Sequence, residues 1–186
     1  MAYNLAQKVS GAAKSVITNM DGAILGIQTL SLCNIHASDS VSVDLYIASQ
    51  VGTDITATDV VSAEAEAVST SSVTLTVDNG SGSASDATND ELKDERIYKS
   101  DGTLFGTCTT VSSTTALVFS GGLSSAIANN DVLHVGKRYY ITKGVVIPVN
   151  NTLVLERNEL RFDPDVYKMY IKLSATDSAV DVITRK

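Results

Sequence analysis

The chain of 186 residues is poor in the residues that most often carry chemistry. It has no Trp, two His, two Cys and two Pro, and aromatic residues make up 5% of it. Two histidines leave little choice of general base or metal ligand, and the sequence contains no Gly-x-Ser-x-Gly motif. We therefore expect a protein that is not an enzyme and that has no cofactor and no metal.

The cysteines are too few for a disulfide framework. Cys33 and Cys108 lie far apart, each in a strand-like run. Small disulfide-stabilised domains carry more cysteines in a shorter chain. We expect two free, buried thiols.

Positive charge is scarce. The 14 Lys and Arg are outnumbered by 21 Asp and Glu, which gives a net charge of −7. Nucleic acids and anionic membranes are bound mainly through clustered Lys and Arg, so neither is an expected partner. Negative charge of this size favours solubility and docking onto a basic protein surface.

Long apolar runs are also missing. No run approaches the ~18 residues of a membrane span, and "MAYNLAQKVSGAAKS" lacks the apolar core of a signal peptide. We expect assembly in a cytoplasm.

The residues that are abundant favour sheets. Val and Thr are β-branched, and Ser, Ala and Asp accompany them throughout the chain. In "VSVDLYIAS" apolar residues alternate from Val41 to Ile47, and "VYKMYIKLS" repeats the pattern from Tyr167 to Leu173. Such alternation is typical of half-buried antiparallel strands, so we predict an all-β protein containing an antiparallel β-sandwich.

The sequence predicts three segments. Residues 1–21 read as an N-terminal arm, and residues 22–50 with 137–186 read as one discontinuous sandwich. Residues 51–136 read as an inserted, small β-barrel-like module of about five short strands, with a possible short helix at Val60–Ala67. Without the insert, "VSVDLYIASQ" runs into "KRYYITKGVVIP" as a hairpin, and hairpin tips tolerate insertions. Within the module, "IYKSDGTLFGT" predicts a hairpin with Asp101 and Gly102 at positive φ.

Several of these runs resemble a known class of proteins. "VSVDLYIAS", "YYITKGVVIPVNNTLVLE" and "SAVDVITRK" resemble small β-sandwich structural proteins of tailed bacteriophages. The stretch from "IYKSDGTLFGT" to "DVLHVG" is similar to small β-modules of virion proteins, especially those of T4-like marine cyanophages. The resemblance extends from about Ala23 to the C-terminus. It implies a virion protein assembled in the host cytoplasm, and it supplies no functional residues.

The histidines and the acidic loop are the first candidate sites. Cys33 and His36 are three residues apart, but no further ligand accompanies them, and His134 stands alone in "DVLHVG". A strand-end histidine bonded to backbone or facing solvent is the expected role. The 78–95 loop carries oxygen donors suited to Ca²⁺, but its spacing matches no EF-hand. We expect a solvated loop, with its donors at Asp78, Asn79, Asp86, Asn89, Asp90 and Glu91.

The remaining candidates are surface features. "SGGLSS" at Ser120–Ser125 has the glycines of a phosphate loop but no Lys, so a strand-end turn is expected. The alternation at Lys168, Tyr170 and Lys172 predicts a basic strand face, either solvated or in contact with an acidic neighbour. Five tyrosines allow either strand packing or an aromatic patch for glycans: Tyr46, Tyr139, Tyr140, Tyr167 and Tyr170.

Together these features predict a non-enzymatic structural component of a phage virion that acts by protein–protein docking. Capsid decoration, neck and tail positions all fit, and the expected partners are other virion proteins and further copies in a homo-oligomer or symmetric array. The alternative is a receptor- or glycan-binding β-module of a tail fibre or surface adhesin.

Overall fold

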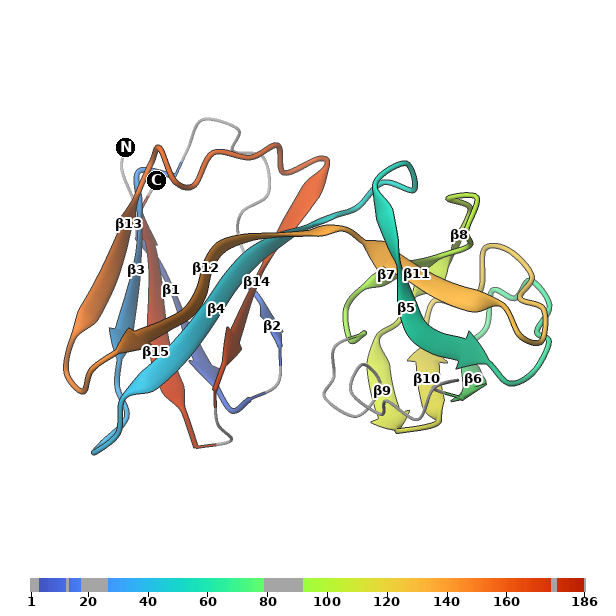
Figure 1. Ribbon diagram of the computed structural model, residues 1–186, viewed down its shortest axis with the longest axis horizontal. Helices are drawn as coiled ribbons and strands as arrows, with labels where there is room; N and C mark the ends of the chain where they lie inside the picture. The colour runs from blue at the N-terminus through green and yellow to red at the C-terminus, as the bar shows by residue number, and fades with distance from the viewer. Residues whose placement is uncertain (1–3, 13, 18–26, 79–91, 175–176, 186) are drawn as a thin grey trace. The chain divides into compact units, whose positions relative to one another are not determined.

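The protein is built from β-strands. The computed structural model describes residues 4–12, 14–17, 27–78, 92–174 and 177–185, and these form antiparallel strands joined by turns, with no helix among them (Figure 1). The predicted all-β class is confirmed. Within the described residues, no helix long and apolar enough to cross a membrane is present.

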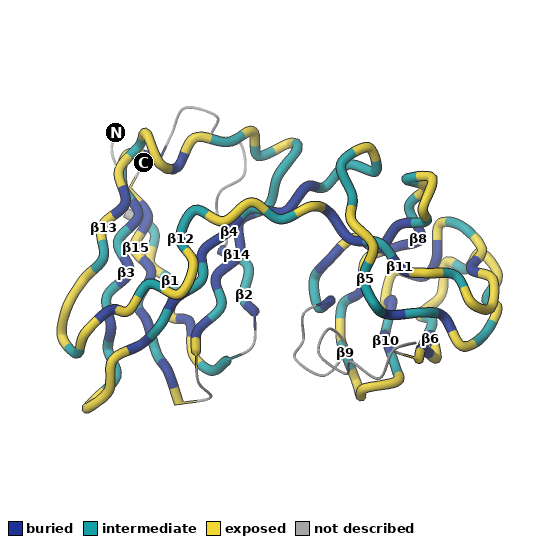
Figure 2. Tube along the Cα trace, viewed as in Figure 1, coloured by how far each residue is buried: buried dark blue, intermediate teal, exposed yellow. Residues whose placement is uncertain are grey.

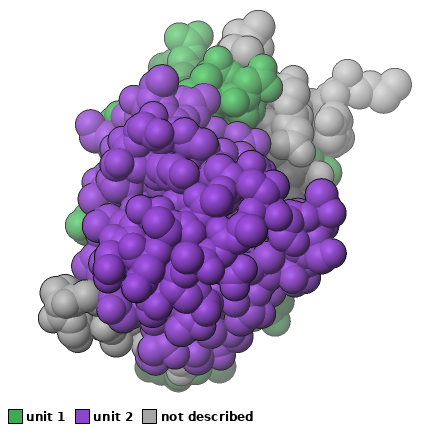
Figure 3. All heavy atoms as spheres, turned by 90° about the vertical axis from the view of Figure 1, so that its right-hand side faces the viewer, with its two compact units in different colours: residues 1–48, 138–186 green, residues 49–137 purple. Residues whose placement is uncertain are grey.

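The chain divides into two compact units. Unit 1 comprises Met1–Ala48 and Arg138–Lys186, and unit 2 comprises Ser49–Lys137 (Figure 3). The sequence analysis placed the inserted module at 51–136 and the discontinuous sandwich on either side of it. The chain thus leaves unit 1 at the end of one strand and returns at the start of its antiparallel partner, where Ala48 pairs with Arg138.

Unit 1 consists of two four-stranded antiparallel sheets. The first has the order β1-β15-β3-β13, with strands Asn4–Ser10, Ala179–Arg185, Thr29–Asn34 and Thr152–Glu156. The second has the order β12-β4-β14-β2, with strands Arg138–Ile147, Val41–Ser49, Tyr167–Leu173 and Ser15–Val16. Both sheets contribute side chains to one hydrophobic core, as in a β-sandwich.

Alternation along the strands decides which side chains enter this core (Figure 2). In β3, Leu30 and Leu32 are fully buried, whereas Ser31 between them is only half-buried. In β4, Val43 and Leu45 face the same core. Because successive strand residues point to opposite sides, each sheet keeps a second, outer face that is available for other roles.

The N-terminal segment is not a separate arm. Asn4–Ser10 forms strand β1, which pairs with β15 over its whole length, and Ser15–Val16 pairs with β14. Val9 is buried in the core of unit 1. The prediction for residues 1–21 is wrong for the described part, because the alternation that buries Val9 was hidden by polar neighbours and by Gly11.

Unit 2 is a seven-stranded antiparallel sheet rather than a barrel. Its order is β8-β7-β11-β5-β6-β10-β9, and β8 and β9 are the two ends. The sheet is not closed, which corrects the barrel-like prediction. It also has more strands than the five expected: β5 Ile55–Ser62, β6 Val73–Asp78, β7 Arg96–Tyr98, β8 Leu104–Thr107, β9 Thr110–Ser113, β10 Ala116–Phe119 and β11 Val132–Gly136.

The sheet of unit 2 nevertheless encloses its own core. Phe105 on β8 and Phe119 on β10 belong to one buried cluster although their strands lie in opposite halves of the sheet. A methyl group added at Gly106 would lie 3.1 Å from the ring of Phe119. The sheet therefore curls over itself without pairing its edges.

No helix forms at Val60–Ala67. Val60 belongs to β5, and Glu66 forms an isolated antiparallel bridge with Ile127. Ala and Glu favour helices, but burial of Val60 against the core of unit 2 outweighs this preference. Tertiary packing decides the structure here.

The hairpin at Ile97–Thr107 is confirmed, with a different turn. β7 pairs with β8, Lys99 N donates to Thr103 O at 2.8 Å, and Gly102 has φ +85°. Asp101 does not adopt positive φ; its carboxylate instead accepts a hydrogen bond from Thr103 N at 2.8 Å. This is the pattern of a three-residue loop with a single left-handed glycine.

Two adjacent glycines test how unit 2 is packed. Gly122 has φ +79°, and a Cβ there would lie 2.0 Å from Ser69 O, whereas Gly121 has nothing within 4 Å. We expect Gly122→Ala to destabilise unit 2 by about 2 kcal/mol or more, and Gly121→Ala to change stability by less than about 0.5 kcal/mol. Urea unfolding followed by hydrogen exchange of residues 49–137 measures both; equal effects would contradict this packing.

Candidate functional site

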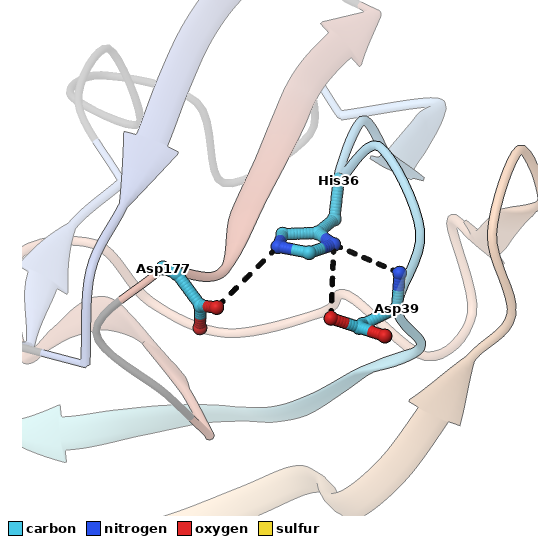
Figure 4. Close-up of side chains that lie close together, drawn as sticks. All are labelled: His36, Asp39 and Asp177. Carbon is cyan, nitrogen blue, oxygen red and sulfur yellow. Dashed lines mark hydrogen bonds and ion pairs between the residues drawn. The ribbon is translucent and has the colours of Figure 1, made fainter.

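His36 lies between two carboxylates at one end of unit 1 (Figure 4). Its Nε2 is 3.6 Å from a carboxylate oxygen of Asp177, and its Nδ1 is 3.7 Å from one of Asp39. The ring also accepts the backbone N–H of Asp39 at Nδ1, at 2.8 Å. These three side chains are the group of potential metal ligands that the described residues bring together.

Asn34 positions this histidine. The Asn34 side chain is buried at the end of β3, and its amide nitrogen donates to Asp39 O and to Ile147 O, both at 2.9 Å. Its Oδ1 accepts the backbone N–H of His36 at 2.9 Å. One amide therefore holds the turn after β3 in shape and ties it to the end of β12.

The hydrogen bonds of His36 indicate that its ring holds the loop to Asp39 in place and does not bind a metal; we call this arrangement of His36 and Asp39 the His36 clamp. Since Nδ1 accepts an N–H, the proton of the neutral ring lies on Nε2, which faces Asp177. A metal-bound histidine instead donates from its second nitrogen to an acceptor. One ligand atom from each of the three side chains lies within 4.8 Å of the others, so it is the hydrogen bond already accepted by Nδ1 that disfavours a metal here.

The cysteines stay separate. Cys33 is half-buried on β3 in unit 1, and Cys108 is buried in unit 2, and both are free thiols. The prediction of free cysteines is confirmed, but the prediction of burial holds only for Cys108. Cys33 is on the outer face of its sheet, opposite Thr152 and Asp181.

Three of the five tyrosines singled out in the sequence form a row across the outer face of the second sheet. The ring centroids of Tyr46 and Tyr170 are 5.5 Å apart and nearly parallel, and Tyr140 lies 5.4 Å from Tyr46. Tyr46 and Tyr170 are nevertheless buried. Their side chains on β4 and β14 form a small second cluster with Ala48, on the face of the sheet opposite the main core.

Cationic side chains accompany this row. Lys14 lies 4.6 Å above the ring of Tyr170, Arg138 lies 5.4 Å from Tyr46, and Lys143 lies 4.7 Å from Tyr140. Lys168, from the predicted basic strand face, also contacts Tyr170 at 5.9 Å. Such contacts are worth roughly 0.5–2 kcal/mol each, so this row stabilises unit 1.

Tyr139 and Tyr167 form a separate edge-to-face pair, with centroids 5.9 Å apart. Tyr139 and Tyr140 are successive residues of β12 and so point to opposite faces of the sheet. The five tyrosines therefore do not form one exposed platform on which a sugar ring would stack.

His134 lines a hollow in unit 2. The hollow measures about 620 Å³, and its walls include Lys99, Asp101, Asn130 and Asp131. The sequence analysis had not connected His134 with the turn at Asp101; their proximity follows from the pairing of β11 with β7.

The polar groups of this hollow are used by local structure. His134 Nδ1 lies 3.0 Å from Val132 O, and Asp131 accepts the backbone N–H of Ala128 at 2.9 Å. The hydrogen bonds from Thr103 lower the pKa of Asp101. In the part of the chain that the structure describes, no hydrogen bond or ion pair joins His134 to either carboxylate. The hollow is thus a product of turn geometry.

The acidic loop and the glycine-rich turn are the two remaining predicted sites in loops. Residues 79–91 of the acidic 78–95 loop lie outside the described residues, so the structure does not test the calcium alternative. In "SGGLSS", Gly122 N donates to Phe119 O at 3.0 Å, which confirms the expected turn after β10.

Apolar side chains on the surface of unit 1 form the remaining candidate site. Val146 on β12 is 59% exposed, Val154 on β13 is 51% exposed, and Ile183 on β15 is 38% exposed. Tyr139 and Tyr140 are also exposed on β12. The strands β12 and β13 are edge strands of their sheets, so Val146 and Val154 lie where another protein has access, whereas Ile183 is on the inner strand β15.

Comparison of the chain with protein-family models, with curated proteins and with solved structures gives no match.

The His36 clamp makes a prediction about metal ions. Because Nδ1 accepts the backbone N–H of Asp39 and Nε2 faces Asp177, we expect added Zn²⁺ to leave the melting temperature unchanged and the His36 ring signals in NMR spectra unshifted. A saturable rise in melting temperature that disappears in both His36→Gln and Asp177→Asn would contradict the clamp and establish a metal site.

Tyr98, which lies next to His134 in the sheet, should affect how the stability of the protein depends on alkaline pH. Its hydroxyl is buried without a hydrogen bond of normal geometry among the described residues, and burial raises the pKa of Tyr98 although the nearby Arg96 opposes the shift. The neutral form is thus favoured in the folded state. The stability it contributes is complete below the ordinary tyrosine pKa of about 10 and is lost as the pH rises toward the raised value.

As the pH rises from about 9.5 to 11, we therefore expect the free energy of unfolding to fall less in the Tyr98→Phe variant than in the native protein. At pH 7 the two proteins should have nearly the same free energy of unfolding. Tyr167→Phe, in unit 1, serves as the control and should keep the native pH dependence. Urea unfolding across this pH range measures the effect, and identical pH profiles for Tyr98→Phe and the native protein would contradict it.

Proposed function

We propose that the protein is a non-enzymatic structural component of a phage virion and that it acts by docking onto other virion proteins. Capsid decoration, a neck ring and the tail are the positions that suit it. The resemblance of "YYITKGVVIPVNNTLVLE" and "SAVDVITRK" to phage β-sandwich proteins supports the proposal. These two runs lie largely in the strands β12, β13 and β15.

The observation that carries the proposal is the exposure of apolar side chains on strands of unit 1. Val154 and Ile183 lie on regular strands, and Val146 lies on β12; the other faces of these strands are anchored in a core. Apolar side chains presented on a rigid sheet are typical of protein interaction surfaces. The net charge of −7 adds complementarity to a basic neighbour.

Symmetry makes weak contacts sufficient. In a shell or ring each copy docks at an equivalent position, and linked binding events raise the overall affinity by about 10²- to 10⁴-fold without stronger individual contacts. A protein of this kind does not need a deep pocket or reactive side chains.

Mass spectrometry of purified particles tests the proposal. Particles from lysates of cells carrying this coding sequence are purified on a density gradient, and peptides of the protein are quantified against those of the major shell protein. We expect the protein to co-purify at a fixed ratio, with hundreds of copies for a decoration protein or about a dozen for a neck ring.

Treatment with salt and a second gradient provides the control, because a contaminant is washed off whereas a component keeps its ratio. Recovery of the protein only outside the particle fraction would overturn the proposed function.

A further inference from the structure

The outer face of the β1-β15-β3-β13 sheet has an ordered arrangement of side chains. Strand register places residues in rows that run across the strands. The middle row contains Val154, Ser31, Ile183 and Ala6, because Ser31 pairs with both Val154 and Ile183, and Ile183 pairs with Ala6. This row has no charged residue, and its two large members are exposed.

The rows on either side carry charges. On one side, Thr29 pairs with both Glu156 and Arg185. On the other side, Cys33 pairs with Thr152 and with Asp181, and Asp181 pairs in turn with the exposed Lys8 of β1. Arg185 and Asp181 thus lie on the same strand, β15, two residues either side of Ile183 and with opposite charge.

This arrangement of side chains is complementary to the same face of a second copy of the chain. Consider a two-fold axis parallel to the sheet and perpendicular to the strands, placed above the middle row. It brings each strand over the same strand of a second copy in the opposite direction. Val154 and Ile183 then face their own equivalents, and Arg185 of each copy faces Asp181 of the other. Glu156 faces Thr152, so no like charges meet at these positions.

We propose that this face is a self-docking surface on which a second copy of the chain binds through the described two-fold axis. The interface has an apolar middle row, with one Arg185–Asp181 pair on each side of it. This self-docking surface extends the proposed docking function by naming a second copy of the chain as the partner. Its biological purpose rests on the proposed function, whereas the self-association itself does not.

Known sheet geometry accommodates this arrangement. Face-to-face sheets lie about 10 Å apart and cross at about −30°, which shifts the outer rows by a few ångströms relative to each other. The long side chain of Arg185 spans such an offset. The axis lies above the middle row, where the shift is smallest and where Val154 and Ile183 meet.

The area predicts a weak interaction. Four strands spaced about 4.8 Å apart, with about six residues of 3.4 Å each, give a face of roughly 400 Å² per copy. The total of about 800 Å² is below the range of stable dimers, so we expect association at high concentration that becomes effective in a symmetric array.

The second sheet of unit 1 offers no equivalent face. Its outer side carries the row of Tyr46 and Tyr170, and both rings are buried. Its edge strand β12 is interrupted by register shifts near Thr142 and has a left-handed Gly144. Such irregularities hinder pairing with another strand. The face with Val154 and Ile183 is the more regular one, because its strands pair without register shifts.

Sedimentation velocity at increasing concentration tests the apolar row. We expect the native chain to show concentration-dependent dimers, and Val154→Lys to weaken association by about tenfold or more. Val132→Lys is the matched control, because Val132 is an exposed strand valine of unit 2 that lies outside the proposed surface, and it should associate as the native chain does. A native chain that stays monomeric up to about 1 mM would overturn the proposal.

A charge exchange tests the register. Arg185→Asp alone places like charges together, and we expect it to weaken association by about tenfold or more, as does Asp181→Arg. The double variant with both substitutions restores the opposite charges and should recover most of the association. Arg161→Asp, which changes the net charge equally on an exposed residue of unit 1, should have little effect.

Circular dichroism and melting temperature verify that each variant is folded, and a variant that fails to fold is replaced by Arg185→Gln or Asp181→Asn. A double variant that associates no better than the single ones would overturn the two-fold register. Particle content is measured independently, so self-association without particle membership refutes only the virion function, and particle membership of a strictly monomeric chain refutes only the self-docking surface.

Discussion

The pairing of β4 with β12 is the constraint on which the architecture depends. This ladder runs from Val41–Ile147 to Ala48–Arg138, and Ser49 N continues it by donating to Lys137 O at 3.1 Å. A Cβ at Gly136 would lie 1.8 Å from Ser49 O, so the two chains approach closely at this point. Strand pairing thereby holds the two ends of this insert together. Within the sandwich, β4 and β12 pair as the two strands of a hairpin do.

Once both ends are held, each unit can complete its own core. The buried cluster around Leu32 and Val43 draws on both sheets of unit 1, and the cluster around Phe105 and Phe119 belongs entirely to unit 2. A loop this long costs little extra closure entropy, since that cost grows only with the logarithm of length. The two sheets of unit 1 can therefore serve different roles: the tyrosine row stabilises one sheet, and the regular outer face of the other sheet is the surface that we propose for docking.

Much of this fold could be predicted from alternation and turn chemistry. The strands at Val41–Ser49 and Tyr167–Leu173 and the glycine turn at Gly102 follow from local pattern. Local pattern failed where tertiary contacts decide the outcome. β1 gains its pairing from a strand at the far end of the chain, and Val60 is buried by a core that its helix-favouring neighbours do not reveal.

The candidate sites show the same division. Strand-end His36 was expected to bond to backbone, and it does, but its partner Asp177 is brought in by folding alone. The rows that join Val154 to Ile183 also depend on register between distant strands, which a single sequence does not display.

Replacement of Ser49–Lys137 by Asn-Gly tests the central claim most directly, because this dipeptide favours the tight hairpin that would then join Ala48 to Arg138. If the β4–β12 pairing closes the sandwich without the insert, the shortened chain should give a well-dispersed amide NMR spectrum, with slow hydrogen exchange in β3, β4 and β14, and should unfold cooperatively. A shortened chain with collapsed amide dispersion and no protected strands would show that the sandwich does not close without the insert.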